Sequence, residues 1–247
     1  MNTSQILATA LVCIGIFPLA ANAGPAPRPL FGVGLIGSYT EMEFSARDTT
    51  GTAHMPEGGV FLNFGNKMTA ESGLVYHAEI SGKYAEKYSE EVKDAQVDLD
   101  LGWRLALDTR NSVDLLAGGG YKYNRFAQDI DGYDIDLTSR TPFVKLAAGY
   151  NHRLNDTTVR VEAGARMAIN GDTQLKLDSI YSERVDLQNR TNPFVEVTFL
   201  FNQQGELPIF ASLYYNRFKY DLDGAFAIDD LDRQTRDEYG AKVGVTF

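Results

Sequence analysis

Cysteine is almost absent from this chain of 247 residues, in which Cys13 is the only one. One cysteine cannot form a disulfide within the chain, so no disulfide framework holds the fold. Basic residues are also scarce, because 23 lysines and arginines stand against 33 aspartates and glutamates and leave a formal net charge of −10. Binding to nucleic acid needs a basic surface, so this charge balance excludes it. After Ala23 no apolar run reaches the roughly 18 residues of a membrane-spanning helix.

The first 23 residues differ in character from the rest of the chain, because they carry no charge. An apolar run over residues 6–21 leads into Ala21-Asn22-Ala23, an A-x-A cleavage pattern before Gly24. This pattern predicts a secretory signal peptide over residues 1–23 and a single mature domain over residues 24–247. The alternative is an N-terminal transmembrane anchor, for which the run is short.

What the chain has in abundance is alternation of apolar and polar residues. It is clearest over residues 97–107. One face carries Val97, Leu99, Leu101, Trp103, Leu105 and Leu107, and the other carries Asp98, Asp100, Gly102, Arg104 and Ala106. A period of two indicates a β-strand. Charged residues opposite an unbroken apolar face are typical of a barrel wall with lipid outside and a polar interior.

The alternation recurs ten times along the chain and predicts an all-β fold. The expected strands cover residues 31–39, 60–64, 74–84, 97–107, 113–126, 141–152, 159–169, 195–201, 209–220 and 239–247. Short turns at residues 66–71, 108–111, 154–157 and 202–206 alternate with longer polar segments at 45–56, 85–92, 127–137, 171–189 and 221–236. This predicts an antiparallel up-and-down transmembrane β-barrel of ten strands, with short periplasmic turns and longer extracellular loops. The alternative of eight strands would require that a pair, such as the second and third, is merged or lost, and twelve would require a hairpin inside 171–189.

The last nine residues carry the alternation to a terminal phenylalanine. Gly240, Val243, Val245 and Phe247, preceded by Glu238, resemble the C-terminal insertion signal of bacterial outer-membrane β-barrels. The mature chain as a whole resembles the small outer-membrane β-barrel ("porin family") superfamily. The resemblance implies a Gram-negative outer membrane, insertion by the barrel assembly machinery, and contact with outer-membrane lipid and lipopolysaccharide. An even number of strands places both termini in the periplasm, and a closed barrel satisfies its own backbone, so we expect a monomer.

The inward faces of the expected strands carry charges of both signs. We expect a polar network in the lumen formed by Asp98, Asp100, Arg104, Lys122, Lys145, Arg160, Glu162, Arg166, Glu196 and Lys242. Charges kept out of lipid must be paired or hydrated. The network is therefore either a set of mutually neutralising ion pairs or the lining of a narrow channel for small solutes or ions.

The chain has three histidines, His54, His77 and His152, which are its first candidates for catalytic residues. An omptin-type protease, which is also ten-stranded, uses acidic and histidine pairs at the outer rim; Asp229-Asp230 is an acidic pair in an outer loop, but no histidine stands clearly opposite. A lipid A-modifying hydrolase would want histidine and serine facing lipid, whereas His77 and Ser81 share a face with Glu79 that we expect to be lumenal. We therefore expect no catalytic residues and no enzymatic activity.

Aspartates gather in the expected outer loops, most densely at Asp129, Asp131, Asp134 and Asp136. Carboxylate oxygens are Ca²⁺ ligands, but the spacing does not fit an EF-hand, so a solvated, repulsive rim is the simpler interpretation. No other cofactor is expected. The resemblance and these loops predict a non-enzymatic surface, structural or interaction role with an extracellular ligand, the alternatives being a narrow channel and an outer-membrane hydrolase.

Overall fold

The computed structural model describes residues 29–46, 49–130, 133–177, 180–203, 205–223 and 231–247. The expected signal peptide lies outside the described residues. Within them, no helix is long and apolar enough to cross a bilayer. The strands are β1 (Leu30–Ala46), β2 (Thr49–Gly65), β3 (Gly73–Lys87), β4 (Glu90–Ala106), β5 (Asn111–Ile130), β6 (Tyr133–Arg153), β7 (Thr157–Ala168), β8 (Asp172–Leu177), β9 (Tyr181–Asp186), β10 (Thr191–Phe201), β11 (Ile209–Asp221) and β12 (Leu231–Thr246).

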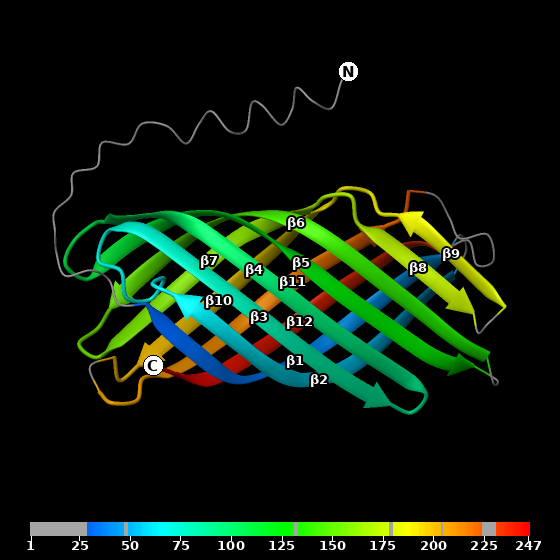
Figure 1. Cartoon of the computed structure of the whole chain (residues 1–247), viewed down its shortest axis with the longest axis horizontal. Helices are drawn as coiled ribbons and strands as arrows, with labels where there is room; N and C mark the ends of the chain where they lie inside the picture. The colour runs from blue at the N-terminus through cyan, green and yellow to red at the C-terminus, as the bar shows by residue number, and fades with distance from the viewer. Residues whose placement is uncertain (1–28, 47–48, 131–132, 178–179, 204, 224–230) are drawn as a thin grey trace, which may run out of the picture.

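Ten of these strands close into a barrel (Figure 1). Each pairs antiparallel with its neighbours in the order β1 to β7, then β10, β11 and β12, and β12 returns to β1. The seam between the first and last strands is long, running from Gly32 opposite Thr246 to Ala46 opposite Leu231. The prediction of a ten-stranded up-and-down barrel is therefore confirmed.

The two remaining strands form a hairpin at the end of the barrel far from the C-terminus (Figure 1). β8 pairs with β6 from Arg140 opposite Asp172 onward, which continues the pairing of β7 with the same strand. β7 with β8, and β9 with β10, are thus two wall strands interrupted near their middles. The hairpin that a twelve-stranded barrel would have required does exist, but it lengthens the wall instead of widening the barrel.

Most of the segments expected as outer loops continue as strand. β1 and β2 reach Ala46 and Thr49, and β5 and β6 reach Ile130 and Tyr133. The polar residues that suggested loops are the outward faces of these strand ends. We call this part of the wall, beyond Tyr39, Tyr84, Tyr123, Tyr215 and Tyr239 and including the β8–β9 hairpin, the outer extension.

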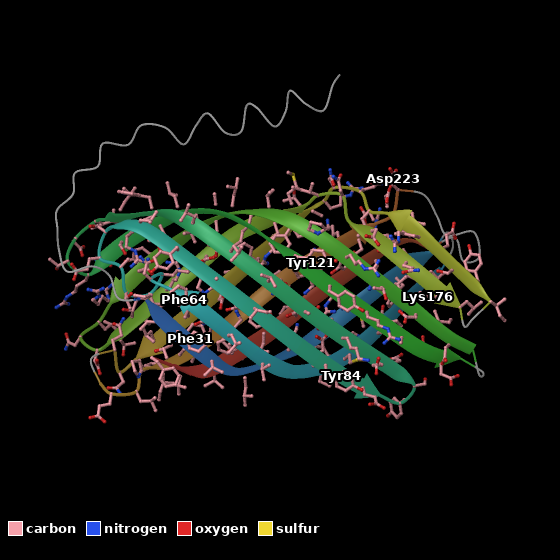
Figure 2. All side chains as sticks on the ribbon, in the orientation of Figure 1. Phe31, Phe64, Tyr84, Tyr121, Lys176 and Asp223 are labelled. Atoms are coloured by element: carbon pink, nitrogen blue, oxygen red, sulfur yellow. The ribbon has the colours of Figure 1, made fainter. Side chains whose placement is uncertain are left out.

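Between these tyrosines and the turn-proximal aromatics lies a stretch that we call the lipid belt. Its outward side chains are apolar and exposed, for example Leu99 and Leu101, while Asp98 and Asp100, which alternate with them, are buried. Phe31 and Phe64 mark its edge near the C-terminus, and Tyr121 lies further along the wall (Figure 2). Aromatic residues at both edges are typical of membrane β-barrels.

The polarity of the alternation reverses in the outer extension. There Glu41 and Glu43 face outward, while Met42 between them is fully buried. Inward apolar residues fill the barrel here in two clusters, which we call the apolar cap: Met42, Met55, Ala85, Val92, Phe126, Leu137, Leu175, Leu187, Phe218, Tyr220 and Leu222. The cap also explains the aromatic residues on both faces of β11, because Phe218 and Tyr220 point into it.

Candidate functional site: the charged interior

The ten charged residues expected in the lumen all lie on the inner faces of the wall. Nine are buried, and the tenth, Glu196, is partly buried. The structure joins them to further charged residues in two groups along the axis. We call these the inner network, nearer the turns that follow β2, β4, β6 and β10, and the outer cluster, next to the apolar cap.

The inner network is built around carboxylates shared between lysines. Lys145 Nζ lies 2.9 Å from Asp100 Oδ2 and 3.4 Å from Glu162 Oε1. Lys67 Nζ lies 2.7 Å from Glu162 Oε2 and 3.5 Å from Asp100 Oδ2. Lys67 belongs to the short turn between β2 and β3, so its side chain enters the barrel from the end. It was missed because a turn residue carries no strand periodicity.

Two arginines, Arg104 and Arg160, also belong to the inner network and pair with its carboxylates. Arg104 donates to both oxygens of Asp114, from Nε at 2.6 Å and Nη2 at 2.8 Å, and Arg160 donates to Glu162 Oε2 from Nη2 at 2.8 Å. Such paired guanidinium–carboxylate bonds are strong and fix geometry. Gly149 is required beside them, because a Cβ there would overlap the Arg160 guanidinium.

Arg166 and Lys242 complete the inner network on the other side of the lumen. Arg166 Nε lies 3.5 Å from Asp98 Oδ1, and its guanidinium stacks 4.2 Å from the centroid of the Phe194 ring. Lys242 Nζ lies 2.6 Å from Glu79 Oε1 and 3.3 Å from Glu196 Oε1.

The outer cluster consists of three cations and three carboxylates, all buried: Glu57, Lys83, Asp94, Lys122, Arg236 and Glu238. Arg236 Nη2 lies 2.7 Å from Glu57 Oε1, Lys83 Nζ lies 2.5 Å from Glu238 Oε1, and Lys122 Nζ lies 2.8 Å from Asp94 Oδ2. Gln96 links the two groups, because Lys122 donates to its amide oxygen and its amide nitrogen donates to Asp98.

Sequence reasoning missed Glu57, Lys83, Asp94 and Arg236 in the outer cluster, and Asp114 in the inner network. Lys83 and Asp94 simply continue alternations already recognised on β3 and β4. Glu57 and Arg236 sit where we expected loops to begin or end. Reading the period of two along the whole length of each strand, and past its last apolar outward residue, would have placed all four side chains inward.

The interior is electrically balanced. Among the described residues, the inner network has six cations (Lys67, Arg104, Lys145, Arg160, Arg166, Lys242) and six carboxylates (Glu79, Asp98, Asp100, Asp114, Glu162, Glu196). Unpaired buried charge is costly, whereas paired and hydrogen-bonded charge is tolerated. The arrangement can therefore fill the barrel with polar side chains without leaving a net charge inside it.

The space left inside the inner network is small. Two adjoining cavities of about 50 and 40 Å³ are both lined by Lys67, His77, Glu79 and Glu196. They have room for a few water molecules. The second cavity extends to Asp94, Lys122 and Glu238 of the outer cluster, and the apolar cap lies beyond these residues.

The three histidines lie far apart on the wall. His77 faces the lumen, with Nδ1 3.7 Å from Asp100 Oδ2. His54 is exposed on the outside and stacks on Tyr39 with ring centroids 5.9 Å apart, and His152 Nδ1 lies 2.8 Å from Asn111 Oδ1 near a short turn. Asp229 and Asp230 lie outside the described residues.

The aspartates proposed as a Ca²⁺ site are at the tip of the β5–β6 hairpin. Asp129 stands opposite Asp134, Asp136 Oδ2 accepts a hydrogen bond of 2.6 Å from Arg125 Nε, and Asp131 lies outside the described residues. No group of three or more potential ligand side chains suited to a metal occurs in the described part of the chain. The Ca²⁺ site stays a prediction.

The expected assembly-signal residues lie at the seam of the barrel. Val243, Val245 and Phe247 face outward on β12, and the Phe247 backbone exchanges two hydrogen bonds with Phe31. Gly240 faces inward beneath the Tyr214 ring, which a Cβ at this position would overlap. The glycine therefore has a packing role in the finished barrel, whatever part it plays in assembly.

Comparison with known proteins agrees with this architecture. The family model "Outer membrane protein beta-barrel domain" matches residues 9–192. A search of curated proteins finds no match. The Escherichia coli outer-membrane protease OmpT is structurally similar, with a TM-score of 0.63 at 8% sequence identity over 90% of this chain and 97% of OmpT.

Two further solved structures are more distant. The translocator domain of the autotransporter NalP from Neisseria meningitidis gives a TM-score of 0.46 at 11% identity, covering 88% of each chain. Ail of Yersinia pestis gives 0.32 at 14% identity, covering 87% of this chain and 98% of Ail. At 8% identity, the similarity to OmpT shows the fold alone. With the family model matching most of its length, the chain belongs to the outer membrane protein β-barrel domain family and is a bacterial outer-membrane β-barrel.

Proposed function

We propose that this barrel is a closed, non-enzymatic scaffold that carries a surface or interaction role on its outer extension. The observation that supports this is the filling of the interior: a neutral network of ion pairs occupies the lipid-belt level, and the apolar cap occupies the level beyond it. Among the described residues, this filling by buried polar and apolar side chains supports a barrel without a solute-sized path between its two ends.

The outer extension offers a firm platform for such a role. Its hairpins are hydrogen-bonded sheet with an apolar interior, and outward ion pairs cross between their strands, including Arg140 with Asp172 at 3.1 Å and Arg217 with Asp237 at 2.7 Å. Among the described residues, aspartates of the outer extension are paired with arginines, which supports a rim of partly compensated charge. Binding residues carried on a rigid scaffold are a common arrangement for recognition.

The orientation in this proposal follows from the turns. The short connections after β2, β4, β6 and β10 would face the periplasm together with both termini, and the outer extension would face the cell exterior. The three histidines lie on different strands, and the only one in the outer extension, His54, is exposed on the outer face of the wall and stacks on Tyr39, which favours a protein without hydrolase chemistry.

A planar-bilayer recording on the folded protein tests the closed interior. We expect no discrete current steps over a range of applied voltages, with a known open porin as the positive control. Regular unitary steps would instead support the narrow-channel function, which the two water-sized cavities favour as the second candidate. Peptidase and lipid A deacylase assays on the wild type and His77→Ala test the enzyme alternative, for which we expect no activity above buffer.

A further inference from the structure

Three cations stand together on the outside of the barrel at the border between the lipid belt and the outer extension. Lys93 on β4 is directly opposite Arg125 on β5, and Arg140 on β6 is directly opposite Tyr123, two residues from Arg125. Their side chains are 45%, 33% and 32% exposed. Like charges directly opposite in a sheet repel each other, and Glu91, which contacts both Lys93 and Arg125, offsets part of this repulsion, so that a further anion on the other side would offset more. We call Lys93, Arg125 and Arg140 the cation triad.

An apolar groove of about 610 Å³ opens on the lipid side next to the cation triad. Gly82 on β3 and Ala95 on β4 are directly opposite each other. Because neither residue has a bulky side chain, the groove is deepest at this pair. The groove walls are Val60, Leu62, Ile80, Val97, Tyr121 and Tyr123. Ala95 and Tyr123 are each two residues from Lys93 and Arg125 along the same strands, which is about 7 Å.

We propose that the cation triad and this groove together bind a phosphorylated, multiply acylated glycolipid of the outer leaflet. Its phosphate would contact the triad and one of its acyl chains would lie in the groove. A planar guanidinium suits the oxygens of a phosphate, and lysine adds a point charge beside it. The tyrosines that flank the groove stand at the level where headgroups meet acyl chains, so both parts of one lipid can reach their sites at once.

Neighbouring carboxylates orient the triad without using all of its donors. Lys93 Nζ lies 2.8 Å from Glu91 Oε1, and Arg125 uses Nε for Asp136 and Nη1 for Glu91 at 3.4 Å. Arg140 uses Nη1 for Asp172 at 3.1 Å. Glu91 and Asp136 are both opposite Ala127, on the side of the triad away from the groove. A lysine has three donors and an arginine five, so donors remain on the groove side for a phosphate.

A second basic patch on the other side of the barrel lacks the groove and serves as a matched control. It consists of Arg217, Lys219 and Arg233 on β11 and β12. Arg217 is engaged by both oxygens of Asp237 at 2.7 Å. Where the first patch has Gly82 and Ala95, this one has the rings of Tyr215 and Tyr239, packed 5.0 Å apart.

The charge test measures binding of diphosphoryl lipid A and of its dephosphorylated form to the folded, full-length protein in detergent, by native mass spectrometry. We expect the wild type to prefer the phosphorylated form, and the variant Lys93→Gln/Arg125→Gln/Arg140→Gln to lose about tenfold or more in affinity for it, which is about 1.4 kcal/mol. The control Arg217→Gln/Lys219→Gln/Arg233→Gln should bind within about twofold of the wild type, which is a few tenths of a kcal/mol.

The groove test fills the floor. A Cβ at Gly82 would meet nothing closer than the Asp94 backbone oxygen at 3.9 Å, so Gly82→Leu occupies the groove without displacing the wall. We expect it to weaken lipid A binding, while Ala163→Leu, which adds bulk to the lipid face of β7, does not. The shift in gel mobility on heating shows that each variant is folded.

Three results would overturn the proposal. These are equal binding of both lipid forms by the wild type, undiminished binding by the triad variant, and an equal loss in the β11–β12 control. Inorganic phosphate binding at the triad, together with no preference of the wild type for the phosphorylated lipid, would assign the triad to the free anion. The proposal does not depend on the closed interior, because conducting and closed barrels alike present this outer face to lipid.

Discussion

The lipid belt and the outer extension are built from the same strands, yet their side chains obey opposite rules. In the lipid belt Leu99 faces out and Asp98 faces in, whereas in the outer extension Glu41 faces out and Met42 faces in. The backbone pairing continues unbroken through the change, so hydrogen bonding does not cause it. The cause is the medium around the outer face of the wall. Where this medium is hydrocarbon the apolar side chains face outward, and where it is water they face inward.

The largest expected effect comes from breaking the outer cluster. Arg236→Met would leave Glu57, Asp94 and Glu238 with two lysines, and we expect the free energy of unfolding in lipid vesicles to fall by about 3–5 kcal/mol. Arg233→Met is the control, because Arg233 is outward and exposed, and its pair with Asp221 should be worth less than about 1 kcal/mol. The additional change Glu57→Gln should restore part of the loss. Equal effects of the two single changes would contradict a buried, balanced interior.

Removing apolar volume should matter more in the cap than in the lipid belt. Met42→Ala leaves a cavity among fully buried side chains, and we expect a loss of about 2–5 kcal/mol in urea titrations. Leu99→Ala removes volume that lipid tails can refill, so its cost should be about 1 kcal/mol or less. A larger loss for Leu99→Ala would show that the cap is loosely packed.

An added outward charge should cost more stability in the lipid belt than in the outer extension. Leu99→Arg places a guanidinium in the lipid belt and should cost about 2–4 kcal/mol, the range for the bilayer midplane. Thr52→Arg, outward in the outer extension, should change stability by no more than about 0.5 kcal/mol. Comparable costs at the two positions would mean that the bilayer boundary lies elsewhere on the wall.

The smallest effect concerns a short turn, outside both regions. The Asn111 side chain and the backbone amides of Arg110 and Asn111 donate to Asp108 and hold its pKa below the ordinary 3.8. Since the folded pKa is the lower one, the contribution to stability is present above the unfolded pKa and is lost as pH falls through the folded pKa. Carboxyl NMR titration should show a midpoint below that of the urea-unfolded chain, and Asn111→Ala should raise it.

The sequence predicted the lipid belt better than the outer extension for a physical reason. An outward Leu99 next to an inward Asp98 is a pattern that only a wall with lipid on its outer side explains well. Strands with this pattern could therefore be recognised from the sequence. Outward Glu41 with inward Met42 is the ordinary pattern of a sheet in water. Next to transmembrane strands this pattern resembles that of a loop. The part of several strands that lies in the outer extension was therefore predicted as loop.

The lumen was predicted residue by residue but not pair by pair. Period two places Asp98 and Lys145 inward, but which cation meets which carboxylate depends on the register between strands far apart in sequence, as for Arg236 with Glu57. Lys67 was beyond any periodic signal, because it reaches the network from a turn. The cation triad and its groove were missed as well, since β4, β5 and β6 had to be aligned before Lys93, Arg125 and Arg140 became neighbours.

The outer cluster also ties barrel closure to charge neutrality. Its partners come from both ends of the chain: Glu57 and Lys83 belong to β2 and β3, whereas Arg236 and Glu238 belong to β12. A chain that has placed every strand except the last would still hold Glu57 without its arginine and Lys83 without Glu238. Pairing of the last strand with the first therefore closes the hydrogen-bonded wall and neutralises the outer cluster together. A barrel open at this seam would have both unpaired backbone groups at its edges and unpaired charges in its interior.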